Sequence, residues 1–162
     1  MLLHPIPPVY DRHSRVLILG SFPSVRSREE GFFYGHPQNR FWKVLAAVFS
    51  APVPVSVPEK KAFLLSHGIA LWDVIARCEI TGSSDASVKN AEPTDLSVIL
   101  QSASVRRVYC NGTLAYDLYR RYQLPMTGLE AVKLPSTSPA NAAWTESRLR
   151  EAWRLITEDA LP

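Results

Sequence analysis

The stretch RVLILGSFPS (residues 15–24) joins a short apolar run to a glycine and a small polar turn. An apolar run of this length that ends at a glycine is typical of a strand buried on both faces of a parallel sheet. The next regular pattern is helical and begins at Phe41, with apolar residues three and four positions apart as far as Val48. Connections between a strand and the following helix usually need only about 2–6 residues. A connection this long, rich in aromatic and polar groups, favours a ligand-binding loop.

Outward from this stretch, apolar runs alternate with helical patterns along the chain. Three more strands are expected at residues 69–74, 105–110 and 130–134. Helices are expected at about residues 40–49 and 58–67, in a short segment capped by Thr94, in a segment that ends near Pro125, and around Trp153. We interpret residues 1–14 as an irregular lead-in and residues 77–93 as a long polar loop. The alternation predicts one α/β domain over residues 1–162, a three-layer α/β/α sandwich with a central, mostly parallel sheet of about four strands.

Composition places the chain among ordinary globular proteins. Its 162 residues are enough for one well-formed core, and 46% hydrophobic and 20% charged residues are usual values for such a domain. The net charge of +3 permits nucleic acid as a partner, but many proteins without such a partner have a similar charge. Charge alone therefore does not decide the function.

The cysteines and histidines give no reason to expect a metal site. Cys78 and Cys110 match no metal-ligand spacing, and the four histidines form no paired motif. In the absence of a signal peptide we expect a reduced, cytoplasmic chain, associated with the nucleoid in a prokaryote. No apolar run approaches the ~20 residues of a membrane span. We therefore expect no membrane partner, and we expect a monomer.

Unusual residues follow all four predicted strands. The first strand is followed by Gly20-Ser21-Phe22-Pro23, the second ends at Asp73, the third is closed by Asn111-Gly112, and the fourth runs into Ser136-Thr137-Ser138-Pro139. In open α/β sheets ligands bind outside the carboxyl ends of the strands. These segments therefore predict one shared site at this edge of the sheet.

The absence of several catalytic motifs from these loops narrows the range of possible functions. They contain no nucleophile elbow with a Ser-His-Asp set, no Walker lysine, no GxGxxG run and no cysteine with a plausible base. Amide and hydroxyl side chains, backbone N–H groups at glycines and aromatic rings remain. Such groups bind a planar polar heterocycle by stacking and edge hydrogen bonds, and short Ser/Thr loops position phosphates. Together they suit an enzyme that flips a base out of a duplex.

Three segments resemble the uracil-DNA glycosylase superfamily. GSFPS (residues 20–24) ends the first strand, where relatives have G-x-[DN]-P-type sequences, and PSTSP (residues 135–139) lies where relatives have an [HN]-P-S loop that grips the minor groove. FYGHPQNRFW (residues 33–42) is similar to a segment of the mismatch-specific branch and is the most specific of the three. Within the superfamily, the chain resembles the hypoxanthine (deoxyinosine) DNA glycosylase branch.

The resemblance implies a monofunctional DNA glycosylase of base excision repair. Such an enzyme hydrolyses the N-glycosidic bond of hypoxanthine, with uracil as a further possible substrate, in double-stranded DNA and without a cofactor. Many relatives carry a catalytic Asp or Asn where this chain has Phe22, and the resemblance transfers that role to Asn39, which orients water or hydrogen-bonds the base. It assigns base binding to Gly20, Ser21, Phe22, Pro23, Tyr34 and His36, with Tyr34 stacking on the base. It assigns DNA contacts to Ser24, Ser136, Thr137, Ser138, Pro139 and Asn141.

Several of these residues also have a purely structural interpretation. Asn39 is a good helix N-cap, a role that is compatible with catalysis. Tyr34 and Phe33 could be core aromatics, although two adjacent rings in a loop can hardly both point inward. His36, which precedes a proline, favours a hydrogen bond that holds the loop over a role as general base. The hydroxyl residues at positions 136–138 could be turn residues.

Two other functions stay open at this point. One is a non-catalytic nucleic-acid-binding module on the same fold, because the first motif lacks its carboxylate. The other is a small-molecule or nucleotide-binding α/β enzyme that uses the same sheet edge. Strand breaks at inosine after alkali treatment would support the glycosylase, and salt-sensitive binding without breaks would favour the binding module.

Overall fold

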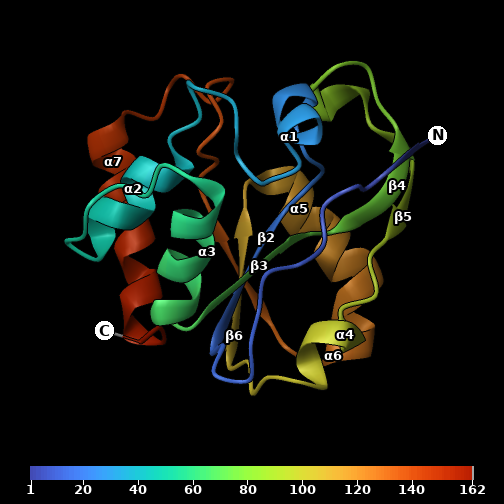
Figure 1. Cartoon of the computed structure of the whole chain (residues 1–162). Helices are drawn as coiled ribbons and strands as arrows, with labels where there is room; N and C mark the ends of the chain where they lie inside the picture. Colours follow the sequence, from blue (N-terminus) through green and yellow to red (C-terminus); the bar gives the residue numbers. More distant parts are fainter. Residues whose placement is uncertain (162) are drawn as a thin grey trace.

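A parallel four-stranded sheet forms the centre of the molecule in a computed structural model that describes residues 1–161 (Figure 1). The strand order is β3 (Ile69–Asp73), β2 (Val16–Gly20), β6 (Arg107–Asn111) and β7 (Ala131–Leu134). All three pairings are parallel, with Leu19 opposite both Trp72 and Cys110. The predicted fold class is confirmed, and each of the four expected strands is present.

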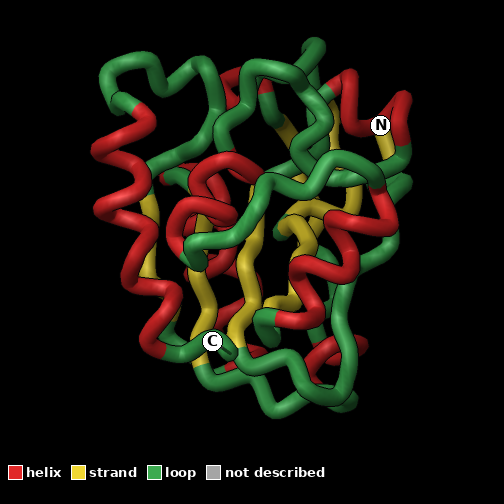
Figure 2. Tube along the Cα trace, turned by 60° about the vertical axis from the view of Figure 1, so that its left-hand side comes forward, coloured by secondary structure: helices red, strands yellow, loops and turns green. Residues whose placement is uncertain are grey.

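β2 is buried on both faces, as its continuous apolar run predicts. Val16 and Ile18 face one side of the sheet, and Leu17 and Leu19 face the other, since side chains alternate along a strand. Figure 2 shows the strands in the middle of the molecule with helices on both sides. No helix among residues 1–161 is long and apolar enough to cross a membrane.

The helices form the two outer layers. The helices on the Val16 and Ile18 side are α2 (Phe41–Val48), α3 (Val57–Ser66) and α7 (Glu146–Trp153), which continues into the 3₁₀ turn η3 (Arg154–Glu158). Those on the Leu17 and Leu19 side are α4 (Ser97–Leu100), α5 (Thr113–Leu118) and α6 (Leu124–Thr127). Phe41, Trp153 and Tyr119 are among the largest fully buried side chains of these layers.

A second sheet occupies segments that we expected to be irregular. β1 (Leu2–Leu3), β4 (Ile75–Glu79) and β5 (Lys89–Pro93) form an antiparallel sheet. The lead-in is therefore irregular only outside Leu2–Leu3, and the prediction of a long loop over residues 77–93 is wrong where β4 and β5 lie. β5 is polar and mostly exposed, and register shifts interrupt its pairing with β4. A short, polar, irregular strand has no apolar alternation for the sequence to reveal. The hairpin between β4 and β5 carries the 3₁₀ turn η1 (Asp85–Ser87).

Three helix boundaries also differ from the expectation. The long loop after β2 contains α1 (Val25–Glu30), whose N-cap is Ser24. Thr94 does not cap α4, because its buried hydroxyl donates to the carbonyl of Asp73 at 2.8 Å; Asp95 accepts from the N–H of Ser97 instead. The helical run continues just past the predicted end near Pro125, to Thr127: a π-helical segment, η2 (Tyr119–Gln123), places the proline in the first turn of α6, where it needs no N–H.

Candidate functional site

A cavity of about 1090 Å³ opens at the carboxyl ends of the parallel strands. It lies between the loop after β2, the hairpin between β4 and β5, and the loop after β7. Every residue that the sequence assigns to base or DNA contacts lines this cavity: Gly20, Ser21, Phe22, Pro23, Ser24, Tyr34, His36, Asn39, Ser136, Thr137, Ser138, Pro139 and Asn141. The predicted convergence of the strand ends is therefore present.

The side chain of Asn39 is held from two sides. Its Oδ1 accepts the N–H of Phe41, the first residue of α2, at 2.9 Å, and the hydroxyl of Thr137, also at 2.9 Å. A backbone N–H can only donate, so the atom that faces Phe41 is the carbonyl oxygen of the amide. Among residues 1–161 no partner accepts from the Nδ2 group. The N-cap of α2 is Arg40, so the predicted N-cap role of Asn39 is corrected: its side chain accepts from the first residue of α2 from the position before the cap. Asn39 retains two N–H donors for the cavity.

Thr137 connects the loop before α2 to the loop after β7 through a buried side chain. It is fully buried, its hydroxyl accepts from Nδ2 of Asn111 at 3.0 Å, and its backbone N–H donates to Oδ1 of Asn111 at 3.1 Å. The Thr137 side chain contacts Asn39 and Asn111, and the DNA contact expected of this residue stays a prediction. Asn111 ends β6, which makes the sheet itself the support of this chain of hydrogen bonds.

Arg40 holds the loop after β7 in place. Its guanidinium donates to the carbonyls of Ser138 at 2.8 Å and Asn141 at 3.2 Å, and also to those of Thr137 and Trp144. Arg40 was not predicted as a functional residue. Its position in the NRF run beside Asn39 was the available signal, but the partners are backbone carbonyls, which have no sequence signature.

The polar side chains of the loop after β7 close short turns. The hydroxyl of Ser136 accepts the N–H of Ser138 at 3.1 Å, and that of Ser138 accepts the N–H of Ala140 at 3.2 Å. Asn141 donates to the carbonyl of Ser136 at 3.0 Å. Both Ser136 and Ser138 keep their hydroxyl hydrogens available, so the turn interpretation does not exclude a phosphate contact.

Tyr34 and Phe33 separate, as expected for two adjacent rings. Phe33 is buried in the core, whereas Tyr34 lines the cavity in the left-handed region with a φ of 54°. The ring of Tyr34 stacks on Phe41 with centroids 4.0 Å apart. Its hydroxyl is buried with no hydrogen-bond partner among the described residues, and burial together with the charge of Asp73 raises its pKa. His36 accepts the N–H of Gln38 through Nδ1, which agrees with a loop-holding role.

Asp73, which lines the cavity, forms a buried pair with His4. Nε2 of His4 lies 2.7 Å from Oδ2 of Asp73, and Nδ1 of His4 accepts the N–H of Ile6. Because Nδ1 accepts, the proton of the ring is on Nε2 and points at the carboxylate. A Cβ on Gly20 would lie 2.5 Å from Oδ1 of Asp73 and 2.7 Å from Oη of Tyr34, so only glycine fits here. His4 belongs to the segment expected to be irregular and was not predicted.

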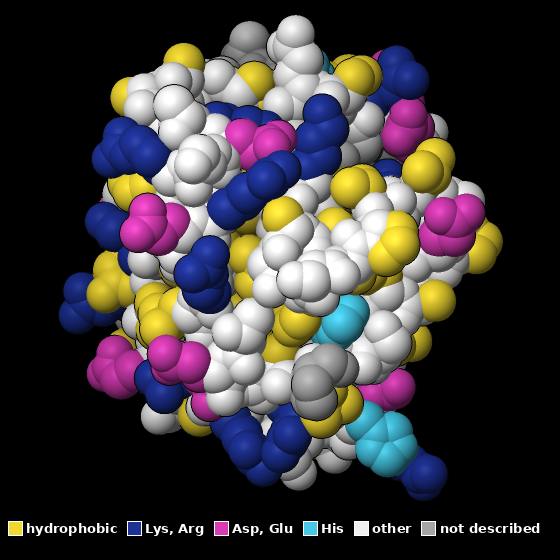
Figure 3. Space-filling view, turned by 90° about the vertical axis from the view of Figure 1, so that its left-hand side faces the viewer, with side chains coloured by type: hydrophobic (Ala, Val, Ile, Leu, Met, Phe, Trp, Pro, Cys, Tyr) yellow, Lys and Arg dark blue, Asp and Glu magenta, His cyan; other side chains and the backbone are white. Residues whose placement is uncertain are grey.

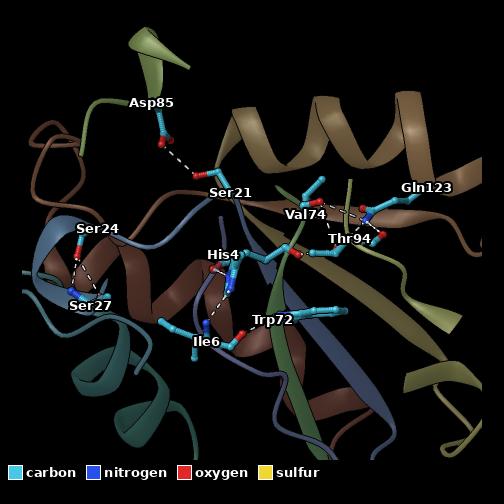
Figure 4. A network of polar contacts seen from close by, with 11 residues as sticks. His4, Ile6, Ser21, Ser24, Ser27, Trp72, Val74, Asp85, Thr94 and Gln123 are labelled. Atoms are coloured by element: carbon cyan, nitrogen blue, oxygen red, sulfur yellow. Dashed lines mark hydrogen bonds and ion pairs between the residues drawn. The ribbon is translucent and has the colours of Figure 1, made fainter. Parts of the chain in front are cut away.

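Asp85 reaches the same cavity from the hairpin. Figure 4 shows its carboxylate directed at Ser21, whose hydroxyl donates to Oδ1 at 3.0 Å. Desolvation at the cavity rim raises the pKa of Asp85, the Ser21 hydrogen bond opposes this shift, and the charge of Asp73 adds to it. The predicted polar loop gave no reason to select this residue, since its partner Ser21 comes from the distant loop after β2.

The side chain of Phe22 can neither donate nor accept a proton, and it packs against apolar neighbours. It belongs to a small apolar cluster with Ile75 and Cys78, and its ring meets that of His4 edge-on at 5.8 Å. Lys133 is the one lysine or arginine among the described residues that line the cavity. The cavity therefore presents mainly neutral donors and acceptors with two carboxylates.

Charges of both signs are mixed on one face of the molecule (Figure 3). On the face that carries α2, α3 and α7, Figure 3 shows Lys and Arg side chains mixed with acidic ones. Arg150, for example, pairs with Glu146 at 2.6 Å. The expectation that net charge alone would not identify the function agrees with this surface.

Comparison with known proteins gives concordant matches. The family model described as "Uracil DNA glycosylase superfamily" matches residues 7–157. A hypoxanthine DNA glycosylase of Methanosarcina acetivorans is 32% identical over 160 residues, covering 96% of this chain and 98% of that protein. A hypoxanthine DNA glycosylase of Methanosarcina barkeri is 30% identical, covering 91% and 92%. The solution structure of a candidate uracil DNA glycosylase from M. acetivorans superposes with a TM-score of 0.77 at 30% identity, covering 93% and 96% of the two chains.

Proposed function

The chain belongs to the uracil DNA glycosylase superfamily, and on this premise we propose that it is a DNA glycosylase of base excision repair whose main substrate is hypoxanthine. Hypoxanthine is the deaminated form of adenine, and uracil, the deaminated form of cytosine, is the second substrate. Both relatives named above carry the hypoxanthine activity in their names, and each is covered over more than nine-tenths of its length. The superfamily match supports excision of a deaminated base in general.

The observation that carries the mechanism is the orientation of the Asn39 amide. Both acceptor positions of Oδ1 are occupied, by Phe41 and by Thr137, while Nδ2 has no partner in the described chain. An amide in this state is a hydrogen-bond donor to the substrate and has no acceptor left for a water proton. We therefore assign Asn39 to the base: it donates to a ring nitrogen or a carbonyl oxygen of the flipped base.

This role fits the chemistry of bond cleavage. As the bond between the sugar C1′ and the base breaks, its electron pair leaves with the base, and the base becomes more negative. A preorganised donor is then worth more in the transition state than in the bound substrate, and such a donor contributes roughly 10²–10³ in rate. The bonds from Thr137 and Phe41 keep the amide in one position, so it does not reorganise during the reaction.

The size of the site suits a flipped nucleoside. The cavity of about 1090 Å³ is comparable to pockets that bury a whole small ligand. Flipping the base out of its stack costs a few kcal/mol of free energy, and this free energy is smaller for a mispaired deaminated base. Selectivity for deaminated bases is supported by this energetic difference as well as by hydrogen bonds in the pocket.

The loop after β7 supplies contacts to the DNA beyond the flipped base. Ser136 and Ser138 have hydroxyl hydrogens available, and Arg40 fixes the backbone that carries them. We propose that these hydroxyls, with Ser24, contact phosphates and so position the duplex without reading its sequence.

The test is excision from a labelled duplex with one inosine, followed by alkali to break abasic sites. Matched duplexes carry uracil or no lesion. We expect breaks at inosine at the highest rate and slower breaks at uracil. Binding of the inosine duplex without breaks at either lesion would contradict the proposal and favour a non-catalytic module.

A further inference from the structure

Two carboxylates line the cavity, and their situations differ. Asp73 is buried, and one of its oxygens is held by His4 at 2.7 Å. Asp85 is on an exposed turn of the hairpin, and it makes no ion pair with any described residue. Of the two, Asp85 is the carboxylate that a substrate can reach.

The position of Asp85 is unfavourable for binding alone. A carboxylate on the rim of a DNA-binding cavity repels the phosphates that must approach it. Arg28 of α1 contacts this hairpin but donates to the carbonyl of Gly82 at 2.9 Å, and Lys133, the cation that lines the cavity, forms no ion pair with Asp85. An unpaired negative charge at this place is suited to a positively charged partner that forms only during the reaction.

The hairpin holds the carboxylate in a defined place. Val25 of α1 donates to the hydroxyl of Ser83 at 2.9 Å, and Ser21 donates to Asp85 itself at 3.0 Å. Figure 1 shows α1 and the hairpin tip next to each other above the sheet. Ser21 directly follows β2. The hydrogen bond thus brings a carboxylate from the hairpin to the end of β2, where the next side chain is the phenyl ring of Phe22.

We propose that Asp85 is a catalytic residue that stabilises the positive charge of the reacting deoxyribose and accepts the proton of the attacking water. In this step the bond from C1′ to the base breaks and its electron pair leaves with the base. The water oxygen then bonds to C1′ while one water proton passes to the carboxylate, which releases it to the departing base or to solvent. The products are an abasic site and the free base, with no oxidation or reduction.

This inference rests on the proposed glycosylase function and completes it. Asn39 has no free acceptor, so it cannot take a proton from water, and Asp85 supplies that acceptor. Asn39 then serves the leaving base while Asp85 serves the sugar and the water.

The first test is single-turnover excision by Asp85→Asn on an inosine duplex. We expect the rate to fall about 10²-fold or more, because a positioned base and a charged stabiliser are both lost. DNA affinity should stay equal or rise, since a negative charge leaves the DNA side. Asp117→Asn removes an exposed carboxylate on α5 outside the cavity and should keep the wild-type rate. An Asp85→Asn rate within about twofold of wild type would overturn the proposal.

The second test does not depend on turnover. Wild-type protein should bind a duplex with a cationic pyrrolidine abasic analogue more tightly than one with a neutral tetrahydrofuran analogue, because the first mimics the charged sugar. Asp85→Asn should reduce this preference at least about 10-fold while leaving the neutral analogue unaffected. An unchanged preference would overturn the role of Asp85. Intact inosine DNA with the wild-type protein would instead contradict the proposed function, and the analogue preference would still report on Asp85.

The dependence of the excision rate on pH is a third test, because a purely structural role of Asp85 would leave this dependence unchanged. Ionised Asp85 is required, so the rate should fall as pH falls through its raised pKa. Ser21→Ala removes a bond that lowers this pKa, and should therefore move the acidic limb to higher pH. The other titratable and charged groups that line the cavity are Tyr34, His36, Asp73 and Lys133, and Arg28 contacts the hairpin from α1. An acidic limb that is unchanged in both Ser21→Ala and Asp85→Asn would contradict the assignment.

Discussion

The hydroxyl of Thr137 donates to Oδ1 of Asn39 at 2.9 Å, and this bond joins the loop before α2 to the loop after β7. One of these loops holds the residue assigned to the base, and the other holds those assigned to phosphates. The bond also saturates the amide oxygen, and thereby determines which side of Asn39 faces the substrate. The two functions of the site are thus coupled by a single buried side chain.

Thr137→Val tests that coupling. Valine has nearly the shape of threonine but lacks the donor, so Asn39 loses one of its two supports and Asn111 loses an acceptor. We expect the unfolding free energy to fall by about 1–3 kcal/mol and the single-turnover rate on inosine to fall about 10-fold or more. Urea denaturation and excision assays measure the two effects. Thr137→Ser, which keeps the hydroxyl, is the matched control, and equal rates for the two variants would contradict the coupling.

Arg40→Lys should weaken DNA binding. A lysine amine cannot reproduce the planar guanidinium that reaches the carbonyls of Ser138 and Asn141 together. We expect a loss of about 2–4 kcal/mol in stability and about a 10-fold loss in affinity for an abasic duplex, since the loop is no longer preorganised. Arg150→Lys changes an exposed pair with Glu146 and should cost at most about 1 kcal/mol. Wild-type affinity in a folded Arg40→Lys protein would show that the loop does not depend on this residue.

Gly20→Ala should disturb the floor of the cavity. The new methyl group would lie 2.5 Å from Oδ1 of Asp73 and 2.7 Å from Oη of Tyr34, so both side chains must move. We expect about 1–3 kcal/mol of destabilisation from overpacking together with a fall in excision rate. The control is Gly128→Ala, where φ is +69° and no atom lies within 4 Å of the added Cβ. That change should cost about 1–2 kcal/mol through backbone strain and leave the rate unchanged. Equal rates for both variants would argue against a functional floor.

The sheet and its site edge could be predicted because β2 is a continuous apolar run that stops at Gly20. Burial on both faces requires such a run, and parallel strands necessarily bring their carboxyl ends to one edge. The position of Asn39 before α2 was also visible, since amide residues are common at helix starts. These features follow from local patterns in the chain.

The features that could not be predicted depend on contacts between segments that are distant in the sequence. β5 is short and polar, so neither the second sheet nor the place of Asp85 beside Ser21 had a periodic signal. His4 meets Asp73 only after β1 pairs with β4. Arg40 acts through backbone carbonyls, which every residue possesses. Residues of these kinds become identifiable only when the fold brings their partners together.

The most direct test of the account is single-turnover excision of hypoxanthine by Asn39→Asp. Aspartate accepts from Phe41 and Thr137 as asparagine does, but the carboxylate cannot donate to the base. If Asn39 is a donor to the leaving base, the folded variant should keep its stability to within about 1 kcal/mol and lose roughly 10²–10³ in rate. An Asn39→Asp protein that excises hypoxanthine at the wild-type rate would contradict the donor role and show that an acceptor is sufficient at this position.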